Sequence, residues 1–244
     1  MTTNGPVLRW PLLAAGVLVC CAVAGCTQNA SARPVFGRHA ALTHVIVGNR
    51  DGRQRAELDV VSGATSVDVD SSDLHGGLYQ VTTPANANGA PVATMDGDVV
   101  QVSLASTKQQ GPSSVRIVLS SDVDWSVRLD GGATEESVDL TGMRLAALDF
   151  GAGAAHIEAT LPAPVGTVPV TMSGGASSFQ LHLPGGVPAR VRFAGGAGSA
   201  TVDGTSKSGV AGGTVVDTPD WPDSVNRYDI DNAAGVSALT LDRS

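Results

Sequence analysis

The chain is 244 residues long and contains 30 glycines and 13 prolines, which argue against long helical architectures because both residues interrupt helices. Hydrophobic residues make up 42% of the sequence and aromatic residues only 4%, so the chain is too apolar to be disordered and predicts a core of Val, Leu, Ile and Ala. The formal net charge is −8, and the only lysines are Lys108 and Lys207. This balance leaves no cationic surface for a phosphate backbone, and nucleic acid is not an expected partner.

Residues 1–25 have the pattern of a secretory signal peptide. Arg9 precedes an apolar run of 16 residues, 10–25, which is shorter than the ~20 that usually cross a bilayer. The run ends in Val-Ala-Gly before Cys26 and resembles the lipobox of bacterial lipoproteins. The resemblance implies cleavage before Cys26 and a diacylglycerol on its thiol. An ordinary signal peptide or a single membrane span is the alternative.

All three cysteines lie at or before position 26. The predicted mature chain of 219 residues (244 minus 25) therefore has no thiol apart from the lipidated one, which excludes a disulfide framework, a Cys-ligated zinc site and a cysteine nucleophile. We expect the lipid, rather than basic side chains, to hold this acidic protein on the outer side of the bacterial cell membrane.

Residues 26–42 are predicted to form a short lipidated tether. The segment Thr27–Pro34 is small and polar and shows no alternation, as in flexible spacers. The remaining residues, 43–244, are predicted to form one domain.

A fourteen-residue pattern recurs through this domain. Its copies begin at Leu58, Val127, Leu148, Val170, Val191 and Tyr228. The four middle copies begin 21, 22 and 21 residues apart, a regularity that indicates an internal repeat.

Each copy has the pattern of two short strands joined by a glycine bend. Apolar and polar residues alternate on both sides of Gly-Ala or Gly-Gly-Ala, which is typical of half-buried strands. We expect the glycines to supply a positive φ and the alanines to fit inside a corner between stacked coils. Because no single turn can bury its own apolar face, the pattern predicts an all-β solenoid of about six coils of roughly 21 residues.

The second position of the repeat predicts a ladder of charges. Neighbouring strands gain stability when opposite charges lie side by side. We expect Arg128 beside Asp149, and Arg192 beside Asp229 if the intervening segment bulges out of the stack. A chance coincidence in a polar column is the alternative.

Two segments depart from the repeat. Residues 78–119 alternate, with a hairpin signal at Asp96-Gly97, and are predicted to continue or cover the solenoid as an extra hairpin region.

The second departure is residues 205–226, which lengthen the spacing of the copies to 37 residues and are predicted to form an insertion loop. Trp221, with Asp220 and Asp223 beside it, is the candidate contact surface of this loop. A Trp221 folded back as a lid over the end of the stack is the alternative.

The stretches 115–133 and 138–154 resemble the adhesin, or toast-rack, domain of bacterial envelope proteins. They are also similar to the C-terminal domain of membrane proteins of the cell-wall-active antibiotic response. The resemblance covers residues 55–244 and rests on the repeat pattern. It implies a single-stranded, right-handed roll like a β-helix, displayed outside the cytoplasmic membrane and without known enzyme activity.

Motifs that carry catalysis are missing from the sequence. No nucleophile elbow, zinc-protease motif or P-loop is present. Glu135 and Glu136 would face opposite sides of a strand and so cannot act as an acid/base pair on one sugar. The run 68–73 carries three aspartates, and we interpret it as a polar strand face rather than a metal site. The same interpretation holds for the histidines, which are His39, His44, His75, His156 and His182. We expect no catalytic residue, no metal and no cofactor.

The sequence thus predicts a non-catalytic envelope lipoprotein that acts as a surface-displayed, adhesin-like binding or structural module. Its expected partners are the membrane, through the lipid anchor, and an envelope protein or a glycan. Two alternatives stay open. A carbohydrate-active enzyme on a β-helix would need two carboxyl groups about 5 to 9.5 Å apart in a cleft. A lipid carrier would need an apolar cavity of roughly several hundred Å³.

Overall fold

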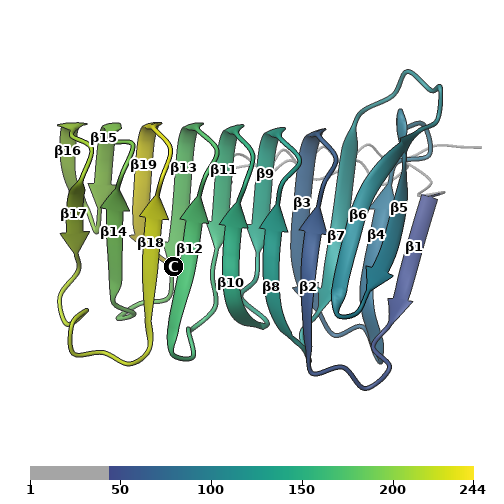
Figure 1. Cartoon of the computed structure of the whole chain (residues 1–244), viewed down its shortest axis with the longest axis horizontal. Helices are drawn as coiled ribbons and strands as arrows, with labels where there is room; N and C mark the ends of the chain where they lie inside the picture. The colour runs from purple at the N-terminus through teal and green to yellow at the C-terminus, as the bar shows by residue number, and fades with distance from the viewer. Residues whose placement is uncertain (1–43) are drawn as a thin grey trace, which may run out of the picture. The chain divides into compact units, whose positions relative to one another are not determined.

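The computed structural model describes residues 44–244, and the predicted signal peptide, Cys26 and the whole of the predicted tether lie outside this part of the chain. Residues 44–244 contain 19 strands in two sheets and no helix, which confirms the predicted all-β, solenoid-like fold (Figure 1). Within the same residues, no helix of the length and hydropathy required for a membrane span is found.

In chain order the strands are β1 (His44–Asn49), β2 (Arg55–Val60), β3 (Ala64–Ser72), β4 (Gly77–Thr83), β5 (Gly89–Asp96), β6 (Val99–Ser106), β7 (Ser114–Ser120), β8 (Asp124–Leu129), β9 (Ala133–Asp139), β10 (Arg144–Phe150), β11 (Ala154–Thr160), β12 (Thr167–Met172), β13 (Ala176–Leu183), β14 (Ala189–Phe193), β15 (Ala197–Val202), β16 (Thr205–Val210), β17 (Thr214–Asp217), β18 (Arg227–Asn232) and β19 (Val236–Arg243).

Each coil contributes one strand to each sheet. One sheet has the order β1-β4-β7-β3-β9-β11-β13-β19-β15-β16, and the other has the order β17-β14-β18-β12-β10-β8-β2-β6-β5. The six predicted repeat copies correspond to the pairs that begin with β2, β8, β10, β12, β14 and β18. β6 and β7 run parallel to β2 and β3, so part of the 78–119 region adds a further coil. The hairpin signal at Asp96-Gly97 is confirmed, because β5 and β6 pair antiparallel around it.

The order of the coils in space differs from their order in the chain. The coil β2–β3 lies between β6–β7 and β8–β9, and the C-terminal coil β18–β19 lies between β12–β13 and β14–β15. The chain therefore passes over an already formed coil twice, and residues 184–188, between β13 and β14, pass the position that β18 and β19 later fill. Residues 121–123 form the first crossover, and residues 218–226 form the second.

The predicted insertion loop 205–226 contains two strands, β16 and β17, in its first part. β16 pairs antiparallel with β15, and β17 pairs antiparallel with β14, so together they close one end of the stack. The turn between β15 and β16 consists of Asp203 and Gly204, which both have positive φ, of 46° and 77°. This backbone conformation suits a two-residue hairpin and explains why the chain reverses there instead of bulging out as a loop.

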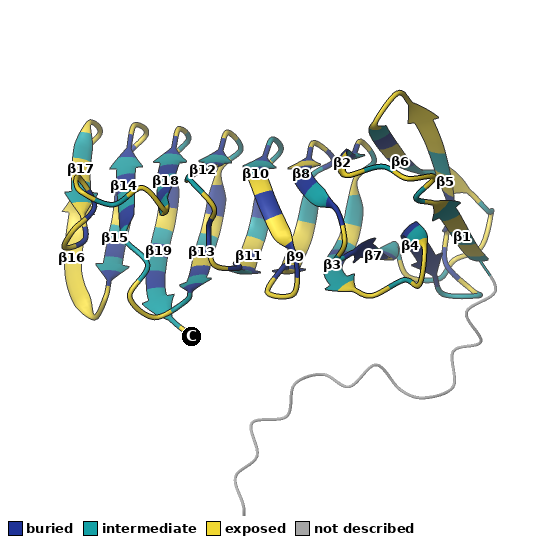
Figure 2. Cartoon of the chain, turned by 90° about the horizontal axis from the view of Figure 1, so that it is seen from below, coloured by how far each residue is buried: buried dark blue, intermediate teal, exposed yellow. Residues whose placement is uncertain are grey.

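Apolar side chains on the inward faces of the two sheets form one core. Buried and exposed positions alternate along most strands (Figure 2). The largest side chains with almost no exposed surface are Trp125, Tyr228, Phe150, Phe179 and Phe193. Rings of Phe150 and Phe179 pack edge to face, with centroids 5.4 Å apart.

The glycine corners are set by close packing of the backbone. A Cβ on Gly131 would lie 2.2 Å from the carbonyl oxygen of Ser62, and one on Gly174 would lie 2.1 Å from the carbonyl carbon of Ala152. Neither glycine has a positive φ, so the expected reason for glycine was wrong at these corners, while Gly196 does have a φ of 78°. The corner alanines line the interior in register, as expected: Ala64, Ala133, Ala154 and Ala176 follow one another across neighbouring strands.

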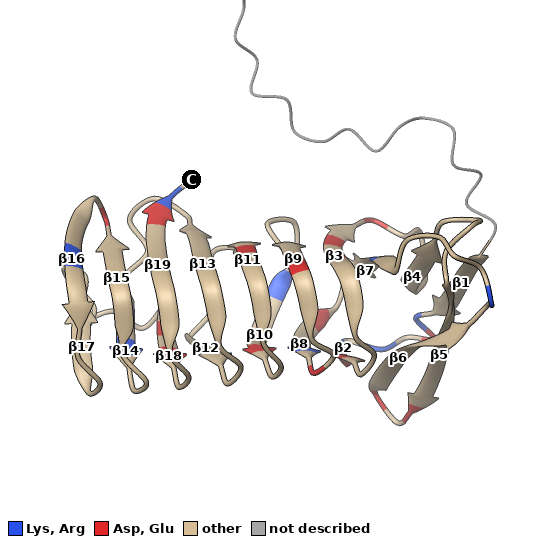
Figure 3. Ribbon diagram, turned by 90° about the horizontal axis from the view of Figure 1, so that it is seen from above, with Lys and Arg blue, Asp and Glu red and all other residues tan. Residues whose placement is uncertain are grey.

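The charge ladder is confirmed with one change of partner. Basic and acidic positions are both spread along the stack (Figure 3). Arg128 lies opposite Asp149, with 3.6 Å between Nε and Oδ2. Arg192 lies 3.9 Å from Asp229, but its partner in register is Asp231, at 3.4 Å. The change arises because Val191 pairs with Ile230 rather than with Tyr228, so the last copy is shifted by two residues relative to the predicted repeat.

Candidate functional site

The strand ends opposite the glycine corners form a rim, which we call the crossover rim. It comprises the two crossovers and the turns at 140–143, 161–166, 184–188 and 203–204. An open groove lies next to each crossover.

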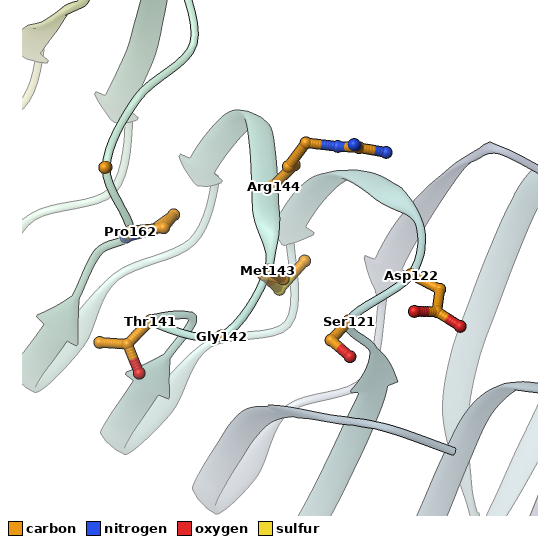
Figure 4. A pocket seen from close by; sticks show the side chains of 8 residues that line it. Ser121, Asp122, Thr141, Gly142, Met143, Arg144 and Pro162 are labelled. Carbon is orange, nitrogen blue, oxygen red and sulfur yellow. The ribbon is translucent and has the colours of Figure 1, made fainter. Parts of the chain in front are cut away.

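The first groove has a volume of about 480 Å³ and lies between the first crossover and the next two turns (Figure 4). Its lining residues are Ser121, Asp122, Thr141, Gly142, Met143, Arg144, Pro162 and Ala163. Asp122 accepts a hydrogen bond of 2.9 Å from Arg50, and Arg144 donates to Asp124. The charges are therefore compensated, and the groove presents hydroxyl groups and backbone rather than net charge.

A tryptophan fixes the first crossover in place. The ring of Trp125 is fully buried below it, and its Nε1 donates a 3.0 Å hydrogen bond to the carbonyl of Ser120. The indole thus fills the core and satisfies the last carbonyl of β7. The nearly buried Met143 lines the groove beside this crossover.

Trp221 holds the second crossover in a similar way. Its ring is only 8% exposed, and its Nε1 donates a 2.9 Å hydrogen bond to the carbonyl of Tyr228. The guanidinium groups of Arg190 and Arg227 lie 3.5 and 4.2 Å from the ring centroid. This packing is a cation-π arrangement that covers the ring. Trp221 is therefore a structural anchor at the start of β14 and β18, neither a free contact residue nor a cover over the end of the stack.

The flanking aspartates of this crossover remain exposed. Asp220 lines the second groove, of about 520 Å³, whereas Asp223 does not. The other lining residues are Gly186, Val187, Pro188, Asp203, Gly204, Thr218, Pro219, Asp242 and Arg243. Arg243 forms two hydrogen bonds with Asp203, of 2.7 and 2.8 Å. Apolar walls and an exposed Asp220 thus characterise this groove, and Asp220 and Asp223 remain predicted contact residues.

Glu135 and Glu136 face opposite sides of β9, as predicted. Glu135 is exposed on the outer face, while Glu136 is 2% exposed and lies between Val67 and Ile157 in the core. Neither carboxylate oxygen of Glu136 has a hydrogen-bond partner among residues 44–244. Burial raises the pKa of Glu136 to about 7. The sequence signal was present, since the equivalent repeat position holds Ile157 in the next copy.

The aspartates of the run 68–73 do not converge on one point. Burial raises the pKa of Asp68, opposed by the Ser66 hydroxyl and assisted by the charge of Asp70. Asp70 accepts a 2.8 Å hydrogen bond from Arg116. Asp73 accepts one of 2.8 Å from the backbone of His75. Each carboxylate therefore has its own neighbour.

The histidines of residues 44–244 also lie apart from one another. His182 lies between two carboxylates, with Nδ1 2.5 Å from Asp242 and Nε2 3.4 Å from Glu158. His44 lies near Thr83 at the far end of the same sheet, and His39 is outside the described residues. No cluster of three His, Cys, Asp or Glu side chains suited to a metal ion occurs within residues 44–244.

No protein-family model and no curated protein sequence matches the chain. Among solved structures it is similar to a candidate cell adhesion protein from Clostridium sporogenes ATCC 15579, with a TM-score of 0.62 and 14% identity over 82% of this chain and 98% of the other. The likeness is one of fold. Candidate adhesins from Bacteroides fragilis NCTC 9343 and Parabacteroides distasonis ATCC 8503 match at 9% and 8% identity over 82% and 81% of this chain and 97% and 96% of theirs. Both have a TM-score of 0.23.

Proposed function

We propose that the protein is a non-catalytic, adhesin-like binding module of the bacterial envelope, held on the outer side of the membrane through lipid on Cys26. The observation that carries the proposal is the solenoid fold, which extends over most of the chain and is similar to that of a candidate cell adhesion protein. The toast-rack resemblance of the sequence points the same way.

A rigid body with a fixed rim suits such a role. Two continuous sheets enclose a close-packed core, so the crossover rim is held by regular structure on both sides. Both grooves lie on this rim. We propose the rim as the contact surface, because loops carried by a rigid scaffold are the usual place of recognition.

The surface chemistry favours a polar interface. The aromatic side chains of residues 44–244 are all buried, so large rings are not available as anchors on the described surface. Recognition would depend on the hydroxyl groups and carboxylates of the rim, with water-mediated contacts. We propose a polar surface of an envelope protein as the partner, bound weakly by each copy.

The anchor is tested by replacing cysteines in the native host. We expect Cys26→Ser to abolish incorporation of radiolabelled palmitate and to release the domain from the membrane fraction or leave the precursor uncut. Cys20→Ser is the matched control and should behave like the wild type. Loss of label from both variants, or from neither, contradicts the proposed anchor.

The contact surface is tested by lysine substitutions and crosslinking in intact cells. We expect Asp220→Lys and Thr141→Lys, on the rim, to reduce the yield of the crosslinked envelope protein several-fold. Thr240→Lys, on the outer face of β19, is the control and should keep the yield. A partner that is lost equally with all three variants, or with the control alone, places the contact elsewhere.

A further inference from the structure

A small apolar cavity opens at the end of the stack that β16 and β17 close. Its volume is about 270 Å³, equivalent to roughly nine water molecules in the liquid. The apolar lining residues are Phe193, Ala200, Val202, Val210 and Val216, which come from both sheets. Asp203, Thr205, Lys207, Asp217, Thr218 and Pro219 complete the lining. The cavity is separate from the two grooves described above, although it shares Asp203, Thr218 and Pro219 with the second.

The cavity lies where one row of inward-facing side chains, on the sheet opposite Phe193, becomes small toward the end of the stack. Across the sheet, Phe179 pairs in register with Leu239, and Leu239 pairs with Ala200. The next residue in this row is Lys207 of β16, directly opposite Ala200. Residues directly opposite each other point to the same side of a sheet, so Lys207 lies on the side of the cavity, where it is an exposed member of the lining. Ala200 and Lys207 therefore occupy the positions that Phe179 and Leu239 hold in the neighbouring coils.

Lys207 is the uncompensated charge of this lining. Asp217 forms two hydrogen bonds with Arg190, of 2.7 and 2.8 Å, and this contact lowers the pKa of Asp217. Arg243 likewise forms a bidentate pair of hydrogen bonds with Asp203. Lys207 forms no ion pair with a carboxylate of residues 44–244. The lining therefore combines apolar walls with one free ammonium group.

We infer that this end of the solenoid binds an unbranched aliphatic carboxylate, with the chain in the cavity and the carboxylate at Lys207. The cavity volume lies at the lower limit of small-molecule sites, which suits one short acyl chain and excludes a diacyl lipid. Each buried methylene should raise the affinity roughly fourfold until the cavity is full. The inference goes beyond the proposed adhesin-like function and does not depend on the lipid anchor or on the rim.

The two lysines of the chain provide a direct test. We suggest labelling the full chain in zwitterionic nanodiscs by reductive ¹³C-dimethylation, which marks Lys108, Lys207 and the amino terminus. Hexanoate, octanoate and decanoate are then titrated while the methyl resonances are followed. We expect the Lys207 signal to shift saturably, with tighter binding for longer chains. Lys108 is exposed and far from the cavity lining, and its signal should stay in place. Parallel shifts of both lysines, or no shift of Lys207, overturn the inference.

Two variants separate the roles of cavity and charge. Ala200→Leu should fill the cavity and weaken octanoate binding at least tenfold by calorimetry, and Val216→Leu serves the same purpose if the first variant does not fold. Lys207→Gln should weaken octanoate binding but leave the binding of 1-octanol unchanged, whereas Lys108→Gln should change neither. Undiminished octanoate binding to a folded cavity-filling variant refutes the site even if the rim still binds its partner.

Discussion

Glu136 provides the sharpest test of how the core is built. Its carboxyl group lies in an apolar row of β9, is 2% exposed and has no hydrogen-bond partner among the described residues. Burial raises the pKa of Glu136 to about 7 in the folded protein, against the ordinary value of 4.5 that applies to the unfolded chain. Between these two pH values the folded state binds the proton that the unfolded state has released. Stability is therefore lost as the pH rises from 4.5 to 7, and the loss is complete above pH 7.

The size of the loss follows from the two pKa values. At 1.36 kcal/mol for each factor of ten in the protonation equilibrium, the ionised carboxylate costs about 3 kcal/mol at pH 8. We therefore expect Glu136→Gln, which keeps the shape but cannot ionise, to match the wild type near pH 4. At pH 8 the variant should be more stable by about 3 kcal/mol.

Urea unfolding between pH 4 and pH 8, followed by tryptophan fluorescence, measures this difference. Glu135→Gln removes an exposed carboxylate from the adjacent position and is the matched control. Its stability should follow the wild type at every pH. A constant difference between Glu136→Gln and the wild type over the whole range would refute the reasoning, because it would show that Glu136 does not titrate in the core.

Three further substitutions test the packing. Asn232→Leu should raise the free energy of unfolding by about 1 to 3 kcal/mol, because Asn232 is fully buried and both polar atoms of its amide lack hydrogen-bond partners among the described residues. Gly174→Ala should lower it by about 2 to 3 kcal/mol, because the new Cβ would lie 2.1 Å from the carbonyl carbon of Ala152. Trp221→Phe should accelerate hydrogen exchange in residues 218–226, because the indole donor of the second crossover is lost.

These three predictions have simple controls. Gly185→Ala should be neutral, because no atom lies within 4 Å of its added Cβ and its φ is not positive. A loss of stability in Asn232→Leu, measured by urea unfolding, would indicate a polar partner for this amide. Equal losses in Gly174→Ala and Gly185→Ala would contradict close packing at the corners. Unchanged exchange in Trp221→Phe would mean that the ring does not fix the crossover.

The strands and corners were predictable because their signals are local. Each of the copies that begin at Val127, Leu148 and Val170 contains its own alternation and its own glycine bend. These three copies also stack in chain order. The position of the C-terminal coil was not predictable. Nothing in the copy that begins at Tyr228 indicates that its strands pair between β12–β13 and β14–β15. The position of this coil depends on how its side chains pack against those of coils that are distant in the sequence.

The candidate sites were predicted less well. The Asp203-Gly204 turn has the same kind of signal as Asp96-Gly97, and it would have predicted a hairpin in place of the expected insertion loop. Trp221 contacts Arg227 and Tyr228, which follow it closely in the chain, but it also lies against Arg190, which is 31 residues away (221 minus 190) and which no local pattern contains. The end cavity depends on the absence of large side chains at one row of the stack. Such an absence becomes visible only when the register is known.

The insertion of β18 and β19 between earlier coils has a consequence for the synthesis of the chain. Until residues 227–243 have emerged, the edges of β12 and β13 on one side and of β14 and β15 on the other have no neighbour. A nascent or truncated chain would therefore expose four open strand edges in its middle, where other chains can add. The last coil therefore completes the stack from within, because β18 and β19 are the strands that pair with both β12–β13 and β14–β15.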